Sequence, residues 1–352
     1  MGETYVDGDI ESDDLTAVLR VLARNLGVST AVDGGVSSIA RWRDILWHCL
    51  RSNTIIGSRR NIAAHYDLSN EFFATFLDPT MTYSCGVFEQ PDATMQQASL
   101  SKYARICQKL RLHPSDRVLE IGSGWGGFAR YAALNVGCHV TSTTISQNQF
   151  EYSRRSLEDA GVGDRVTLLQ RDYRQLEGRF DKLVSIEMIE AVGERYLPIF
   201  FNKCCELLRP DGAMLLQAIT IPDHRYDHYR RSVDFIQKHV FPGGFLPCSA
   251  AIGDCLRRQT DFRMFSWEEI GPHYAKTLRR WRQAFRQNVS DVRALGFDDR
   301  FVRLWEYYLR YCEAGFAERQ IGAAQLVLTK PASRLPDFIQ SPLQTYPARS
   351  AV

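Results

Sequence analysis

The sequence predicts a doubly wound α/β fold, in which helices cover both faces of a parallel sheet. Short hydrophobic strands alternate with helical stretches between residues 116 and 220. A glycine-rich turn follows the first of these strands, and polar loops follow others, at the edge where sheets of this class bind ligands. With 352 residues, 45% of them hydrophobic and 24% charged, the chain is expected to form one main domain with smaller appendages.

A short helical appendage is expected over residues 1–60. Residues 13–26 have helical periodicity, and a second helix is expected over 37–50. The segment 41–60 carries five arginines and one aspartate, so its formal charge is +4. Such a segment can lie on an anionic lipid surface, or it can be a core-facing helix with a solvated basic face. The sequence leaves both options open.

The main domain is expected over residues 61–330. Five strands are predicted, at Arg117–Ile121, His139–Thr144, Val166–Gln170, Lys182–Ile186 and Ala213–Ala218. Three helices are predicted between them, at Phe128–Leu134, Gln147–Ala160 and Leu197–Leu208. Residues 221–320 interrupt this pattern with an aromatic, arginine-rich and mostly helical insertion, and 325–328 is predicted to be a final strand. The tail 331–352 contains four prolines and is expected to be irregular.

The composition argues against several classes of protein. A formal net charge of +2 gives no reason to expect nucleic acid as a partner. The nine cysteines show no CxxC or cysteine–histidine ligand spacing, so no metal site is expected and the thiols are expected to be reduced. No signal peptide is recognised, and the longest apolar runs are shorter than the roughly 20 residues of a membrane span. A cytoplasmic protein is therefore expected.

The turn after the first predicted strand indicates a nucleotide-type cofactor. Gly122 and Gly124 lack the Cβ atom that would keep a ligand away from the backbone, and the helix that follows offers free N–H groups. No Lys-Ser/Thr pair follows, so the turn is not a P-loop. The spacing of Glu120, Gly122 and Gly124 resembles the signature of S-adenosylmethionine (SAM) dependent methyltransferases. It implies a Rossmann-like class I SAM-dependent methyltransferase fold.

Five ordered blocks carry a more specific resemblance. They are residues 64–85, 118–127, 144–149, 187–193 and 241–244. In this order and at these separations they resemble the cyclopropane fatty acid synthase family, which includes mycolic acid cyclopropane synthases and related fatty-acyl C-methyltransferases. The resemblance covers roughly residues 60–330 and leaves the appendage and the tail outside.

The resemblance implies SAM as cofactor and a set of residues that hold it. By this resemblance, the loop at Tyr83 and Ser84 would cover the methionine part, and Gln149 would reach the ribose. The second strand ends in neutral threonines rather than in an acid, which is consistent with that role. Glu120 would orient the glycine turn or meet the ammonium group of SAM. The complete set is Tyr83, Ser84, Glu120, Gly122, Gly124, Thr144, Gln149, Asp172 and Tyr173, of which Asp172 would bind the adenine amine and Tyr173 would stack on the ring.

The resemblance also implies a reaction at an unactivated cis alkene. The SAM methyl group is passed to one alkene carbon, the neighbouring carbon becomes a cation, and a base removes a proton from the new methyl group so that a cyclopropane ring closes. Aromatic faces can stabilise such a cation. In the family the base is a bound bicarbonate ion. The positions that match its binding residues are Cys85, Glu190, Gln217, Ile219 and Tyr308.

Gln217 departs from the pattern of many bacterial cyclopropane synthases, which have histidine there. A glutamine amide can donate and accept hydrogen bonds, but it cannot become charged or carry a proton. Together with residues 221–226 it resembles a branch that includes plant cyclopropane synthases and bacterial enzymes that make methylene- or methyl-branched chains. Bicarbonate is therefore expected to bind differently or less tightly, and the product is left open.

Three functions remain open at this point. The first is one-carbon transfer from SAM to an unsaturated acyl lipid, with peripheral attachment to a membrane surface. The second is methylation of a small amine, which needs a polar pocket and no bicarbonate site. The third is a lipid-surface module without catalysis, which the intact glycine turn and Gln149 argue against. The oligomeric state is also left open, a homodimer being one option.

Overall fold

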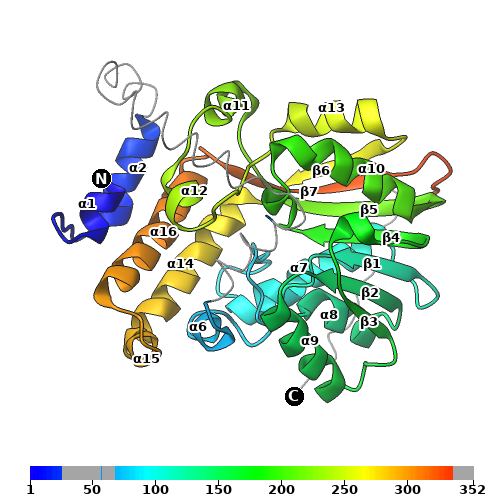
Figure 1. The fold of residues 1–352 in the computed structure, drawn as a ribbon, viewed down its shortest axis with the longest axis horizontal. Helices are drawn as coiled ribbons and strands as arrows, with labels where there is room; N and C mark the ends of the chain where they lie inside the picture. The colour runs from blue at the N-terminus through cyan, green and yellow to red at the C-terminus, as the bar shows by residue number, and fades with distance from the viewer. Residues whose placement is uncertain (26–56, 58–67, 336–352) are drawn as a thin grey trace.

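A computed structural model describes residues 1–25, 57 and 68–335 of the chain (Figure 1). The second predicted helix, the basic segment 41–60 apart from Gly57, and residues 336–352 lie outside the described residues. No helix within the described ranges combines the length and the apolar character that crossing a membrane requires.

A seven-stranded sheet forms the centre of the molecule, with the strand order β3-β2-β1-β4-β5-β7-β6. Five strands run parallel, namely β1 (Arg117–Ile121), β2 (His139–Thr144), β3 (Val166–Gln170), β4 (Phe180–Ile186) and β5 (Leu208–Thr220). These are the five predicted strands, and they are confirmed. Residues 213–218 of β5 are completely buried, which is why residues 213–216 form a continuous apolar run rather than an alternating pattern.

The five strands predicted to be parallel are parallel, and the sheet is mixed because two antiparallel strands follow at one edge. Strand β7 (Gly322–Thr329) was expected, but it pairs antiparallel with β5, and β6 (Arg263–Glu269) pairs antiparallel with β7. Strand β6 lies inside the segment that was expected to be mostly helical. Its first three residues are exposed at the sheet edge, so it lacks the apolar pattern by which strands are recognised.

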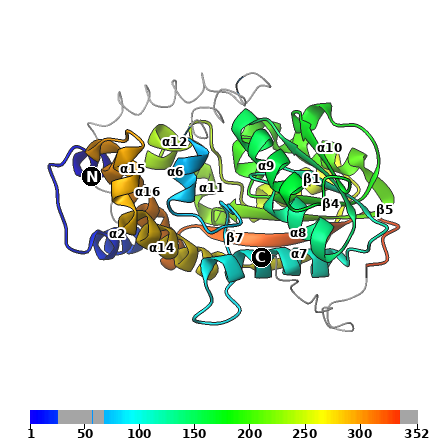
Figure 2. The ribbon, with the colours of Figure 1, turned by 90° about the horizontal axis from the view of Figure 1, so that it is seen from below.

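Helices cover both faces of the sheet, as a doubly wound fold requires. On one face lie α7 (Met95–Leu110), α8 (Gly127–Asn135) and α9 (Gln147–Asp159), and Figure 2 shows α7 running along the sheet. On the other face lie α10 (Leu197–Leu207) and α13 (Ser249–Gln259). Helix α7 begins with a capping box between Thr94 and Gln97. This helix matters for function because it carries a lysine to the site described below.

A separate aromatic core lies beside the carboxyl edge of the sheet. It joins α6 (Asn70–Ala74) to α14 (Gly271–Gln287), α15 (Val289–Ala294) and α16 (Asp299–Ala317). Its largest fully buried side chains are Phe72, Phe73, Trp281, Phe285 and Trp305. The short helices α11 (Asp223–Tyr229) and α12 (Phe235–His239) complete this part of the insertion.

The described N-terminal residues pack against the insertion. Helices α1 (Gly2–Val6) and α2 (Leu15–Arg24) lie along α16 (Figure 1). Helix α2 is the first predicted helix, and its N-terminus is capped by the Asp14 side chain, which accepts a hydrogen bond from the Ala17 N–H at 3.0 Å. Glu318, just beyond α16, accepts hydrogen bonds from the guanidinium groups of Arg20 and Arg24.

Candidate active site

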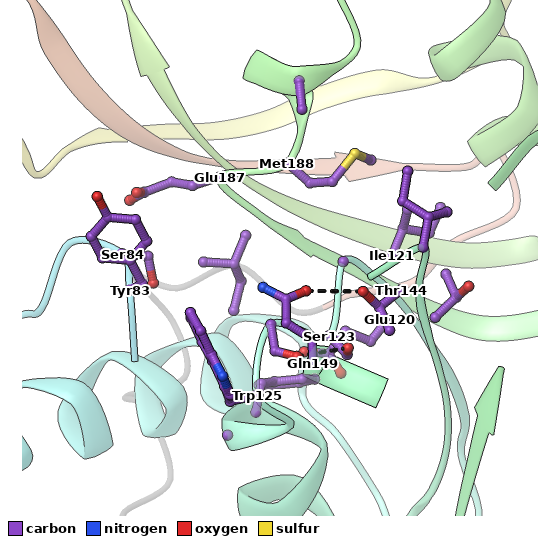
Figure 3. Close-up of a pocket in the computed structure, with 18 of the residues that line it drawn as sticks. Tyr83, Ser84, Glu120, Ile121, Ser123, Trp125, Thr144, Gln149, Glu187 and Met188 are labelled. Atoms are coloured by element: carbon purple, nitrogen blue, oxygen red, sulfur yellow. Dashed lines mark hydrogen bonds between the residues drawn. The ribbon is translucent and has the colours of Figure 1, made fainter. Parts of the chain in front are cut away.

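A pocket opens at the carboxyl ends of β1, β2 and β4, where the fold class predicts a ligand (Figure 3). All nine residues predicted to hold SAM line it: Tyr83, Ser84, Glu120, Gly122, Gly124, Thr144, Gln149, Asp172 and Tyr173. The five residues predicted to hold bicarbonate do not line this pocket themselves. The carboxyl-bearing side chain that lines it on that side is Glu187, directly after β4.

The glycine turn has the geometry that a closely approaching ligand needs. Gly122 and Gly124 have φ angles of +94° and +50°, in the left-handed region. The N–H groups of Gly122 and Ser123 donate to the Thr143 carbonyl at 3.0 and 2.9 Å, which fixes the turn against β2. A Cβ atom at Gly122 would come within 3.0 Å of the Met188 side chain, so a larger residue there would force the pocket wall to move.

Gln149 lies on the first turn of α9, which is capped by Ser146. The Thr144 hydroxyl donates to Oε1 of Gln149 at 2.9 Å, and this bond directs the amide NH2 into the pocket (Figure 3). A neutral donor is therefore placed where many nucleotide sheets place an acid.

Glu120 is a buried carboxylate at the back of the pocket. Its side chain is 1% exposed and accepts a hydrogen bond from the Ser142 hydroxyl on β2. Burial raises the pKa of Glu120 to about 8, although the Ser142 hydrogen bond and the charge of Lys102 act in the opposite direction. A cation bound beside it would stabilise the ionised form.

Asp172 and Tyr173 lie on the same side of the pocket but have partners of their own. Both Asp172 oxygens accept from the Arg174 guanidinium, at 2.8 and 2.7 Å. The Tyr173 ring packs edge-on against Phe200, with centroids 5.5 Å apart. The predicted contacts of these two residues with adenine stay predictions.

The loop at Tyr83 and Ser84 connects the pocket with the predicted base site, by which we mean the residues predicted to hold bicarbonate and their partners. The hydroxyl groups of Tyr83 and Tyr308 lie 2.8 Å apart, so a loop residue and a residue of α16 share one hydrogen bond. Ser84 accepts a hydrogen bond from the ammonium group of Lys102 on α7, at 2.5 Å. Lys102 is fully buried, and burial lowers its pKa to about 8.

The groups predicted to hold bicarbonate already bind two carboxyl groups of the protein. The Cys85 N–H and the Gln217 amide donate to Glu187 at 2.9 and 2.7 Å, and the Ile219 N–H donates to Glu190 at 2.5 Å. The other oxygen of Glu190 is buried and has no hydrogen-bond partner among the described residues. In this arrangement these N–H donors bind carboxylates of the protein itself rather than a separate anion. Bicarbonate binding stays a prediction.

Two further details bear on the base site. Burial and the nearby charge of Glu187 raise the pKa of Glu190 to about 8. Burial also raises the pKa of the Cys85 thiol, which donates to the Gly86 carbonyl at 3.3 Å. Cys85 thus contributes its backbone N–H and is not a thiolate nucleophile.

Comparisons with known proteins identify the family of the chain. A family model described as mycolic acid cyclopropane synthetase matches residues 54–326. The chain belongs to this family. The class I SAM-dependent methyltransferase fold is thereby confirmed, and the protein is a SAM-dependent methyltransferase of the cyclopropane synthase family.

Several relatives of this family cover most of the chain. It is 41% identical over 340 residues to tuberculostearic acid methyltransferase UfaA1 of Mycobacterium tuberculosis, covering 94% of this chain and 78% of that protein. It is 34% identical over 334 residues to cyclopropane-fatty-acyl-phospholipid synthase of Escherichia coli, covering 94% and 82%. The solved structure of mycolic acid cyclopropane synthase CmaA1 with SAH and CTAB has 32% identity and a TM-score of 0.72, over 77% of this chain and 98% of that one.

Three site residues are absent from the sequence-based prediction. Glu187 lies in a block that resembles the cyclopropane synthase family, and its position directly after β4 is the signal that could have found it. Lys102 lies in the middle of α7, and Tyr274 lies near the start of α14. Neither stands in a motif, and only the fold brings them to Glu187. No cluster of three potential metal ligands occurs among residues 1–25, 57 and 68–335.

Proposed function

We propose that this enzyme transfers a one-carbon unit from SAM to the cis double bond of an unsaturated fatty acyl chain carried by a phospholipid. One observation carries the proposal: the nine predicted SAM residues and the carboxyl group of Glu187 line one pocket, beside a wall of aromatic rings. The relatives named as a tuberculostearic acid methyltransferase and as a cyclopropane-fatty-acyl-phospholipid synthase support the acyl substrate.

The aromatic wall suits a cationic intermediate. The Tyr83 ring lies 5.1 Å from Trp281 and 6.5 Å from Phe241, measured between centroids, and Phe241 lies 5.9 Å from Tyr308. Bound SAM would supply an electrophilic methyl group, and its transfer leaves a positive charge on the neighbouring alkene carbon. Each aromatic face stabilises such a charge by about 0.5–2 kcal/mol. An apolar chain with an internal double bond fits this wall.

The cofactor residues take separate roles in this proposal. The amide of Gln149, oriented by Thr144, donates to the ribose, and Glu120 meets the ammonium group. Tyr83 and Ser84 close over the methionine part. Asp172 and Tyr173 define the adenine end, and Gly122 and Gly124 let the cofactor approach the backbone.

Two products are candidates. A cyclopropane forms when the proton is lost from the new methyl group and its electron pair closes the ring. A methylene branch forms when a hydride first moves to the cationic carbon and the same methyl group then loses the proton. Because the chain is 41% identical to a tuberculostearic acid methyltransferase, the methylene branch stays a candidate product. A phospholipid carrier, peripheral attachment to the membrane and a cytoplasmic location belong to the proposal as well.

The test is a product assay with the purified chain, labelled SAM and vesicles that contain cis-monounsaturated phospholipid. The fatty acid methyl esters are analysed by gas chromatography–mass spectrometry, before and after mild hydrogenation. We expect a product heavier by one CH2 unit. Resistance to hydrogenation identifies a ring, and uptake of hydrogen identifies a retained or shifted double bond. Labelled amine without labelled acyl chains would refute the proposal.

Replacing Gln149 is expected to weaken SAM binding without changing the fold. Gln149→Ala removes one hydrogen-bond donor, and the loss of about 0.5–1.5 kcal/mol corresponds to an affinity lower by about 2- to 13-fold. Isothermal titration calorimetry measures the affinity. The matched control is Gln147→Ala, because Gln147 lies on the same helix turn but is exposed and bonds to Glu151 and Gln170 outside the pocket. An unchanged affinity of Gln149→Ala would remove Gln149 from the site.

A further inference from the structure

Glu187 is the one carboxyl-bearing residue of the base site that lines the SAM pocket. Oε1 accepts hydrogen bonds from the Cys85 N–H at 2.9 Å and from the Gln217 amide at 2.7 Å, and Oε2 accepts from the Tyr274 hydroxyl at 2.6 Å. The donors come from three different elements, the 81–85 loop, β5 and α14. Such bonds hold a carboxylate in one orientation and favour its ionised form.

The direction of the Gln217 amide follows from a chain of hydrogen bonds. The Lys109 ammonium can only donate, and it donates to Oε1 of Gln325 at 2.6 Å. Gln325 then donates from Nε2 to Oε1 of Gln217 at 2.9 Å. The remaining NH2 of Gln217 must therefore face Glu187. Gln217 is fully buried and acts as a fixed donor to a carboxylate.

The backbone of Glu187 is held in an uncommon conformation. Its φ angle is +49°, which is rare for a residue other than glycine. The Glu187 N–H donates to the Gln217 carbonyl at 2.8 Å, so main chain and side chain bind the same residue. Strain of this kind persists where surrounding contacts enforce it, and it concentrates at functional sites.

We propose that Glu187 is the general base of the reaction and takes the role predicted for bicarbonate. The two donors that the family resemblance assigns to bicarbonate on this side, Cys85 and Gln217, hold Glu187 instead. A carboxylate and bicarbonate present the same planar pair of oxygens, so one can replace the other. This inference rests on the proposed function and names the residue that completes it.

The proton step balances without a further reactant. After methyl transfer a C–H bond of the new methyl group breaks, and its proton goes to an oxygen of Glu187. The electron pair of that bond forms the second ring bond to the cationic carbon, or the methylene double bond after a hydride shift. The proton then passes from Glu187 to solvent. Both candidate products therefore use the same base.

The experiment compares wild type, Glu187→Gln and Glu187→Gly in buffer depleted of carbon dioxide, with and without millimolar bicarbonate. Wild type is expected to form acyl product at the same rate in both buffers. Glu187→Gln keeps the size of the side chain but cannot accept the proton, so kcat is expected to fall by about 10²- to 10⁴-fold. Its SAM affinity, measured by calorimetry, is expected to fall far less than kcat.

Glu187→Gly separates a base from a merely structural residue. Glycine tolerates the positive φ, and removal of the side chain makes room for an anion beside Cys85 and Gln217. We expect bicarbonate to restore part of the activity of Glu187→Gly and none of the activity of Glu187→Gln. A structural role would not produce this difference between the variants.

The control variant is Glu313→Gln, which changes a buried carboxylate that binds Arg279 and Arg282 outside the pocket. Its product rate is expected to match wild type in both buffers. The inference fails if wild type requires bicarbonate, if Glu187→Gln reacts at the wild-type rate, or if folded, SAM-binding Glu187→Gly gains nothing from bicarbonate. Absence of acyl product from wild type in both buffers would instead refute the proposed function.

Discussion

Lys102→Met is expected to lower the free energy of unfolding by about 3–5 kcal/mol, because it removes the cation from a buried group of charges. The Lys102 side chain is fully buried, and its charge acts on Glu187, Cys85, Asp78 and Glu120. Methionine fills similar space, so the loss reflects charge rather than a cavity. Chemical denaturation of the apo protein near neutral pH measures it.

The same substitution is expected to shift the pH dependence of catalysis. Burial raises the pKa of Glu187, while Lys102 and the hydrogen bonds from Tyr274, Gln217 and Cys85 lower it. Without Lys102 the pKa of Glu187 rises further, so the ionised base is lost at a higher pH as the solution is acidified. The acidic limb of the kcat profile should therefore move toward higher pH.

Lys203→Met is the matched control for this prediction. Lys203 lies on α10 and forms an ion pair with the exposed Glu206, 3.8 Å away, so the expected change in unfolding free energy is about 0–1 kcal/mol. Its acidic limb should coincide with that of wild type. If Lys102→Met is as stable as this control and keeps the same acidic limb, Lys102 does not compensate the buried carboxylates.

Much of the sheet could be predicted because its central strands are buried. Strands β1 and β5 contain buried apolar runs that alternate with helical stretches, and this pattern depends on local sequence alone. Strand β6 could not be found in this way, since Met264 and Phe265 are exposed at the sheet edge. It exists because β7 offers it a partner, and that pairing is a property of the assembled sheet.

The candidate site, like the sheet, has one part that could be predicted from the sequence and one part that could not. The glycine turn, Gln149 and the Tyr83–Ser84 loop stand in short motifs, so the sequence predicts where they gather, and all line one pocket. The partners of Glu187 are far apart in the chain, at Cys85, Gln217 and Tyr274, and no spacing joins them. Their convergence requires the insertion to fold against the sheet, so a carboxylate among these donors can be recognised only in three dimensions.

Binding of SAM is expected to release a proton from Glu120. In the apo protein burial raises the pKa of Glu120 from its ordinary value of 4.5 to about 8. At a pH one unit below this pKa, about nine in ten Glu120 carboxyls are protonated. The positive charges of SAM favour the ionised form, so its binding lowers the pKa and expels the proton. The SAM affinity should accordingly rise with pH up to about the pKa of Glu120 in the apo protein.

The stability of the apo protein should depend on pH in the opposite direction to the SAM affinity. A group whose pKa is raised on folding contributes stability at a pH below its pKa in the unfolded state. This contribution is lost as the pH rises through its pKa in the folded state. For Glu120 the window extends from about 4.5 to about 8, so the apo protein should lose stability across it. Thermal unfolding with and without SAM measures both dependences on the same samples.

Calorimetry in two buffers of different ionisation enthalpy counts the released protons directly. Wild type near neutral pH is expected to release close to one proton for each SAM bound, and Glu120→Gln none. Without the charged hydrogen bond, worth about 1.5–3 kcal/mol, the Glu120→Gln variant should bind SAM about 10- to 100-fold more weakly. Glu158→Gln, on the exposed face of α9 beside Arg154, should behave as wild type. Equal binding heats for wild type in both buffers would mean that SAM binding releases no proton. Glu120 would then be ionised before SAM binds or stay protonated in the complex, and the prediction would be wrong.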